Sequence, residues 1–192
     1  MPVPTLSVCV FCGSRPGLSS AHGAEARLLG ALIARRGWRL VYGAGDIGIM
    51  GEVARSALAA GGDVFGVIPT HLMQAEQGKH TIGTLVVTET MHERKKVMFT
   101  NSDAVVVLPG GAGTLDEFFE VLTWRQIGLH SKPIFLLDTD GFWQPLIGLV
   151  EHVIAQGFAA PSLREFFVAV ESVEALERAL GELLVPAFGT SK

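Results

Sequence analysis

The chain has 192 residues, of which 48% are hydrophobic and 18% charged, and its formal net charge is −4. This composition suits one packed domain and is too apolar for a disordered chain. The acidic balance, without a basic block, disfavours nucleic-acid binding, which usually shows a basic patch or stripe. No apolar run reaches the roughly 18 residues that a membrane span needs.

The first residues, MPVPTLSVCVFC, lead directly into an apolar run, without a basic flank or a small-residue cleavage site. We interpret them as the start of a strand rather than a signal peptide, and expect a soluble, cytoplasmic protein. Cys9 and Cys12 end this strand on opposite faces, whereas a redox pair would begin a helix. We therefore expect two buried thiols. The six scattered histidines give no sign of a metal site.

Short apolar runs alternate with helical patterns along the chain. The predicted strands are residues 6–11, 39–42, 63–68, 84–87, 104–108, 133–137 and 167–170. The predicted helices are residues 20–36, 48–60, 91–101, 113–128, 142–156 and 173–184. Continuous apolar runs are typical of parallel strands buried on both faces. The alternation predicts an α/β fold with a doubly wound parallel sheet, in a single domain over 1–192 with an ordered core of about 5–185.

Glycine-rich turns follow three of these strands: CGS at 12–14, GAGDIG at 43–48 and PGGAGT at 109–114. Ligands of doubly wound sheets bind beyond the carboxyl ends of the strands, so the three turns are expected at one edge. One such turn is weak evidence, because any tight turn uses glycine. Three together are better explained by a shared phosphate ligand than by turns alone.

The segment PGGAGTLDE, residues 109–117, is the strongest candidate for a nucleotide site. Its glycines let backbone N–H groups approach an anion, Thr114 can cap the following helix, and the helix N-terminus adds partial positive charge. It lacks the lysine of a P-loop, and Asp116 stands where a dinucleotide fingerprint has its third glycine. Asp116 and Glu117 are expected in the first helical turn. Asp116 there would complement the helix dipole, whereas a carboxylate beside an anion site favours a function for Glu117.

Two further segments could contribute. MHERKK, residues 91–96, opens the helix before the PGG strand, where Arg94 can bind phosphate or ribose oxygens through two hydrogen bonds and Lys95 adds a point charge. Cations at a helix start oppose its dipole, which favours a function over a solvated face. The connection 69–83 is long enough for a lid. Glu76 lies within it, and alone would be an exposed loop acid.

With these residues in view, the chain resembles the LOG (Lonely Guy) family, whose members are often mislabelled lysine decarboxylases. The resemblance covers nearly the whole chain and rests on VFCGSRPG, YGAGDIGIMG, MHERK, and PGGAGTLDE with the following TW. It implies a modified Rossmann fold, usually a homodimer. It also implies hydrolysis of the N-glycosidic bond of purine, cytokinin-type nucleoside 5′-monophosphates, such as isopentenyladenosine monophosphate or AMP, giving free base and ribose 5-phosphate. No metal or other cofactor is required.

Carried over by motif, Arg94 and Glu117 would be the catalytic pair, with Glu117 beside the ribose. Arg94 would hold the phosphate or ribose, or assist the leaving base. The expected substrate-binding residues are Gly13, Ser14, Gly45, Glu76, Lys95, Gly110, Gly111, Ala112, Gly113, Thr114, Leu115, Asp116 and Thr123. Ala44, where many members have glycine, and Ala112, where plant members have a bulkier residue, bear on substrate preference.

Other functions remain open at this stage. A non-hydrolytic nucleotide-binding or carrier module, like the related molybdenum cofactor carriers, would need the glycine turns but not both Arg94 and Glu117. A pyridoxal-phosphate decarboxylase would need a lysine placed for a Schiff base, which is not evident. Aromatic and methionine residues at helical or strand spacing are expected in the core or a subunit interface: Trp38, Trp124, Trp143, Met50 and Met98. An isoprenyl group would need an apolar pocket, from Met91, Met98 and Trp124 or from a second subunit.

Overall fold

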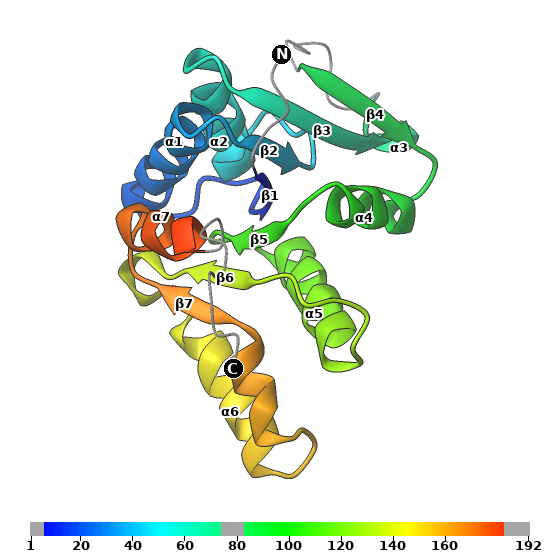
Figure 1. Ribbon diagram of the computed structural model, residues 1–192, viewed down its shortest axis with the longest axis vertical. Helices are drawn as coiled ribbons and strands as arrows, with labels where there is room; N and C mark the ends of the chain where they lie inside the picture. The colour runs from blue at the N-terminus through cyan, green and yellow to red at the C-terminus, as the bar shows by residue number, and fades with distance from the viewer. Residues whose placement is uncertain (1–5, 74–82, 183–192) are drawn as a thin grey trace, which may run out of the picture.

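The computed structural model describes residues 6–73 and 83–182 (Figure 1). One parallel sheet is formed by β1 (Ser7–Phe11), β2 (Arg39–Tyr42), β3 (Asp63–Pro69), β4 (Thr84–Thr88), β5 (Ala104–Val107), β6 (Ile134–Leu137) and β7 (Val168–Val170). The strand order is β4-β3-β2-β1-β5-β6-β7. All seven predicted strands are confirmed, each within one residue at either end, because continuous apolar runs mark strands covered on both faces.

Six helices match the predicted ones: α1 (Ser20–Arg35), α2 (Gly48–Ala59), α4 (Met91–Thr100), α5 (Ala112–Gln126), α6 (Gln144–Ala155) and α7 (Val173–Glu182). The short helix α3 (Thr70–Met73) and two 3-10 turns, η1 (Thr139–Gly141) and η2 (Pro161–Phe166), are not among the predicted elements. These pieces span few residues and have no helical periodicity to reveal them. The rest of the predicted lid, with Glu76, lies outside the described residues.

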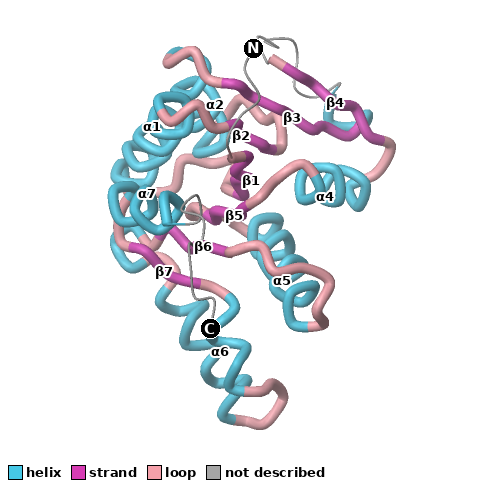
Figure 2. Tube along the Cα trace, viewed as in Figure 1, coloured by secondary structure: helices cyan, strands magenta, loops and turns pink. Residues whose placement is uncertain are grey.

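Two apolar clusters lie on opposite faces of the sheet, which confirms the doubly wound α/β fold. One cluster packs α1, α2 and α7 against the strands, and the other packs α4, α5 and α6. Figures 1 and 2 show α1, α2 and α7 along one side of the sheet and α4 and α5 along the other. Cys9 and Cys12 are buried and unpaired, and they belong to different clusters, as predicted.

The expected aromatic and methionine residues are core residues. Trp38, Trp143 and Met98 are buried, while Met50 and Trp124 pack partly buried against the clusters. Because Met98 is only 1% exposed, it cannot line an open isoprenyl pocket, and that part of the prediction is wrong. No helix in residues 6–73 and 83–182 has the length and apolar character to cross a membrane.

The strand order creates a switch point beside β1, which pairs with β2 on one side and β5 on the other. The chain leaves β1 toward β2, and after β4 it crosses back to build β5, β6 and β7. The connections after β1 and β5 therefore diverge at the carboxyl edge. Crevices of this kind hold the ligands of doubly wound sheets, so the topology places the CGS and PGG turns side by side.

Candidate active site

The three glycine turns meet at this edge. The backbone N–H of Gly13, after β1, donates to the Pro109 carbonyl, after β5, at 3.0 Å. The Met50 N–H, in the first turn of α2, donates to the Gly13 carbonyl at 3.1 Å. A Cβ atom at Gly48, whose φ is +59°, would lie 2.3 Å from the Ser14 carbonyl carbon. Only glycine fits this left-handed, crowded position.

Gly110 and Gly111 offer a matched pair of substitutions. A Cβ atom at Gly110 would lie 2.1 Å from Thr114 Oγ1 and 2.8 Å from the Gly13 nitrogen, whereas nothing lies within 4 Å of one at Gly111. We expect Gly110→Ala to lower the free energy of unfolding by about 1–3 kcal/mol through overpacking. Gly111→Ala meets no neighbouring atom and loses only the preference for glycine at an N-cap, so it should lower this free energy by less, about 0.5–1 kcal/mol. Urea unfolding of both variants measures this, and equal losses would contradict the packing described.

Helix α5 begins one residue earlier than predicted, at Ala112, with Gly111 as its N-cap and no side-chain cap. Thr114 is therefore not the cap. It lies inside the first turn, 3% exposed, beneath Gly110. Glycine is tolerated at an N-cap. The helix can therefore start after Gly111, two residues before Thr114. The first N–H groups of α5 lack intrahelical acceptors and stand ready for an anion, and the backbone at 111–113 is exposed.

Glu117 lies in the second turn of α5, not the first as predicted, and only 8% of it is exposed. Burial raises the pKa of this carboxyl to about 7; the nearby Arg94 charge opposes the rise, and Asp116 adds to it. Burial therefore makes the neutral form of this carboxyl more favourable than it is in water. A carboxyl tuned in this way is typical of general acid–base or charge-stabilising groups in active sites.

Arg94 reaches the same edge from α4, and 7% of it is exposed. Its Nε donates to the Val67 carbonyl at 3.1 Å, and its Nη2 donates to the Gly43 carbonyl at 2.7 Å. Arg94 and Glu117 form no ion pair within the described chain, although the Arg94 charge affects the Glu117 pKa. The sequence predicted that cations at the start of α4 oppose the helix dipole. Instead, Thr90 and Glu93 form a capping box there, and the Glu93 carboxylate complements the dipole.

Lys95 joins α4 to α5 rather than facing an open anion site. Its Nζ contacts Asp116 Oδ2 at 2.9 Å and Glu120 Oε2 at 3.1 Å. Burial lowers the Lys95 pKa, but the hydrogen bonds to these two carboxylates outweigh it, so the net shift is upward. Asp116 thus pairs with a cation instead of only complementing the helix dipole. Glu120 is not among the predicted site residues, although its spacing of four residues from Asp116 indicates a shared helix face.

Four further residues were predicted to bind the substrate. Ser14 lies exposed beside Gly48, and Leu115 is half-buried against the second apolar cluster. Gly45 is buried and its N–H donates to Met50 Sδ at 3.2 Å, so it does not face an open anion site. Thr123 is exposed on α5, six residues beyond Glu117, and points to a different side of the helix.

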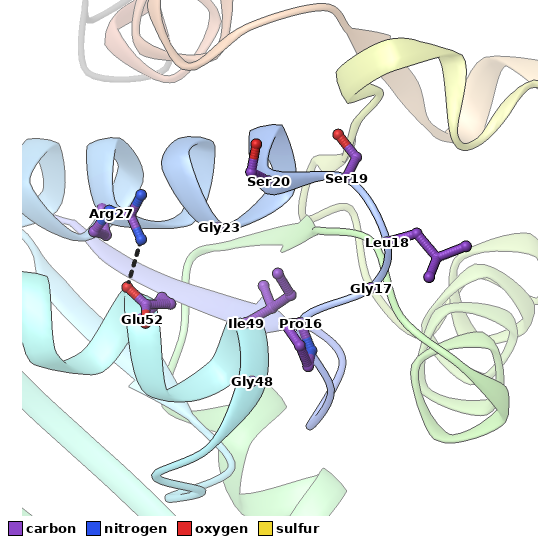
Figure 3. Close-up of a pocket in the computed structure, with 10 residues that line it drawn as sticks. All are labelled: Pro16, Gly17, Leu18, Ser19, Ser20, Gly23, Arg27, Gly48, Ile49 and Glu52. Carbon is purple, nitrogen blue, oxygen red and sulfur yellow. Dashed lines mark hydrogen bonds and ion pairs between the residues drawn. The ribbon is translucent and has the colours of Figure 1, made fainter.

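A cavity of about 420 Å³ opens beside the CGS turn, between the starts of α1 and α2 (Figure 3). Backbone and side chains of residues 16–20 line one wall, and an Arg27–Glu52 ion pair of 2.8 Å lies at another. Neither Arg94 nor Glu117 lines this cavity. It lies on the α1–α2 face, whereas Glu117 comes from α5 on the opposite face.

Known proteins resemble this chain over most of its length. A family model described as "Possible lysine decarboxylase" matches residues 50–180. A probable cytokinin riboside 5′-monophosphate phosphoribohydrolase of Oryza sativa subsp. japonica is 45% identical over 91% of this chain and 77% of its own. The corresponding enzyme of Rhodococcoides fascians is 43% identical, over 90% of this chain and 87% of its own.

Solved structures share the fold. The molybdenum cofactor carrier protein of Chlamydomonas reinhardtii has a TM-score of 0.71 and 22% identity, over 93% of this chain and 98% of its own. The molybdenum cofactor binding protein of Rippkaea orientalis has a TM-score of 0.71 and 22% identity, over 96% and 99%. At 22% identity, these structures show the similarity of the fold alone. The family model and the sequence relatives show that the chain belongs to the LOG family of cytokinin riboside 5′-monophosphate phosphoribohydrolases.

Proposed function

We propose that this chain hydrolyses the N-glycosidic bond of purine nucleoside 5′-monophosphates, releasing free base and ribose 5-phosphate. The observation that carries the proposal is the buried Glu117 carboxyl, with its pKa near 7, on the helix whose open N-terminus suits a phosphate. Glu117 lies five residues into α5 from Ala112, a rise of about 7 Å. This is comparable to the length of a ribose 5-phosphate, so one helix can bind the phosphate and place a carboxylate near C1′.

Cleavage of this bond passes through a state with positive charge on the ribose, as in glycoside hydrolysis. The C1′–N bond breaks and its electron pair leaves with the base. A water oxygen then bonds to C1′, and its proton passes to the Glu117 carboxylate and on to the base. The carboxylate stabilises the ribose charge and orients the water. Arg94 supplies a fixed positive charge whose field acts on the Glu117 carboxyl and favours its ionised form.

A substrate panel tests the proposal. We expect AMP and isopentenyladenosine monophosphate to release free base with a kcat/KM at least about 10²-fold above the matching nucleosides, because remote phosphate binding supports the reacting geometry. CMP should be a poor substrate. Chromatography of the released bases measures this. Equal rates on nucleosides would contradict the phosphate site, and binding of AMP without release of base would favour the carrier alternative.

A lysine decarboxylase is less consistent with the described lysines near the sheet. Schiff-base chemistry needs an amine free to attack a carbonyl. Lys95 is bound to two carboxylates, and Lys132 donates to the Phe99 carbonyl at 2.6 Å while lying over the Phe99 ring. Both amines are therefore engaged, while Lys96, the other described lysine, is exposed on α4. An absence of cofactor absorbance in purified protein, together with base release from AMP, would separate the two functions.

The homodimer is part of the same proposal. Thr123 and Ile127 lie four residues apart at the end of α5, so they face the same side, and Ile127 is 63% exposed. Leu129 follows at 69%. A second copy covering this face would explain why Thr123 points away from the Glu117 of its own chain. Light scattering measures the mass. We also propose a cytoplasmic location, which suits the two unpaired thiols.

A further inference from the structure

We infer that Gly43 is a positioning residue that seats the Arg94 guanidinium, and that the GAG turn serves this seat rather than binding phosphate. The test of this inference by enzyme activity rests on the proposed hydrolysis, whereas its test by stability does not. Gly43 directly follows β2, and its carbonyl accepts from Arg94 Nη2 at 2.7 Å. Nothing in the residue type of a glycine turn reveals this role, because the contact is made by backbone across 51 positions of sequence.

The space above Gly43 is filled by the guanidinium. A Cβ atom there would lie 1.8 Å from Arg94 Nη2, 2.8 Å from Cζ and 3.3 Å from Nε. The φ of Gly43 is not in the left-handed region, so backbone conformation does not demand glycine. What demands glycine is room: any side chain at this position must displace the guanidinium.

The contacts that hold the Arg94 guanidinium lie where the pairing of β2 with β3 stops. The pairing of β2 with β3 ends at Tyr42 opposite Gly66, so Gly43 and Val67 are the next residues beyond it. Arg94 donates to both of their carbonyls, Nη2 to Gly43 and Nε to Val67. The planar guanidinium thus bridges the residue after β2 and a residue inside β3, in place of further β2–β3 ladder bonds. A guanidinium has five N–H donors in a rigid fork, and these contacts fix its plane while leaving donors for a substrate.

The rest of the turn does not compete for this role. Ala44 carries a methyl group despite its φ of +58°, and the residue is 2% exposed and packs in the first apolar cluster. The Gly45 N–H is taken up by Met50 Sδ. Of these three residues, Gly43 is therefore the one whose missing side chain serves Arg94.

A double-mutant cycle tests the inference with wild type, Gly43→Ala, Arg94→Ala and the double variant, and with Gly148→Ala as control. Nothing lies within 4 Å of a Cβ at Gly148, on α6 far from the turns. Gly43→Ala should lower kcat/KM for adenine release from AMP by about 10²-fold, as expected when a catalytic group is misplaced by about 1 Å. It should also lower the urea midpoint. In the Arg94→Ala background, Gly43→Ala should change either quantity little. Gly148→Ala should leave kcat/KM unchanged and raise the urea midpoint slightly, because alanine is favoured over glycine inside a helix.

The outcomes are separable. Equal losses from Gly43→Ala with and without the Arg94 side chain would overturn the inference, as would a Gly43→Ala variant with full stability and activity. If the wild type releases no base from any monophosphate, the proposed function fails, yet the stability half of the cycle still tests the seat. If Arg94→Ala does not fold, Arg94→Met, which keeps the apolar stem without the fork, takes its place in the cycle.

Discussion

At pH 8, the Glu117→Gln variant should unfold with a free energy about 3 kcal/mol higher than the wild type, while adenine release falls by at least about 10²-fold. The folded-state pKa of Glu117 is about 7, above the ordinary carboxyl value. Because this pKa is raised by folding, the folded state favours the proton. The stabilising contribution is complete below the unfolded pKa and is lost as the pH rises through about 7. Glutamine stays neutral at every pH, so the variant does not lose this folding free energy as the pH rises.

The gain in stability should therefore depend on pH. Urea unfolding at pH 5 and pH 8 should show the two proteins nearly equal at the lower pH and separated at the higher one. Glu165→Gln, at an exposed carboxyl, is the matched control and should change neither stability nor activity. Equal stabilities of Glu117→Gln and wild type at pH 8 would mean that burial does not penalise the ionised carboxylate.

Arg94→Met should lose both stability and activity. The substitution leaves the carbonyls of Gly43 and Val67 without their donors, at a cost of about 1–3 kcal/mol for each buried group. We expect kcat/KM to fall by at least about 10²-fold, because the fixed positive charge is removed. Since the Arg94 charge lowers the Glu117 pKa, the pH midpoint of any residual activity should move upward.

Arg94→Lys is the informative companion. It retains a positive charge but cannot make two hydrogen bonds in one plane. Its pH midpoint should stay closer to the wild-type value, while its urea midpoint should fall with that of Arg94→Met. An unchanged pH midpoint in Arg94→Met would show that the guanidinium does not act on Glu117.

Much of the fold could be predicted from local pattern. Strands such as β5 are apolar at every position, and this alone identifies a strand covered on both faces. The sequence also places the CGS and PGG turns together, because β–α alternation fixes which strand ends share an edge. The start of α5 was misplaced by one residue because Gly111 can serve as an N-cap while Thr114 has the more usual capping side chain.

The chemistry of the site was less accessible from sequence. The raised pKa of Glu117 depends on burial by distant segments, which the residue type does not show. The partners of Arg94 are backbone carbonyls 27 and 51 positions away, and a carbonyl carries no side-chain signal. Lys95 reads as a free cation in MHERKK but is held by carboxylates of α5. Motif spacing identifies such residues as candidates, whereas tertiary packing decides which groups they bind.

The most direct test is the pH dependence of kcat/KM for adenine release from AMP by the wild type. The second ionisation of the phosphate lies near pH 6, so the informative range is above it. If the Glu117 carboxylate is the working form, the rate should rise through a midpoint near 7, the pKa of this group, and level off at higher pH. A rate that is flat or falls between pH 6.5 and 8.5 would contradict this assignment of Glu117.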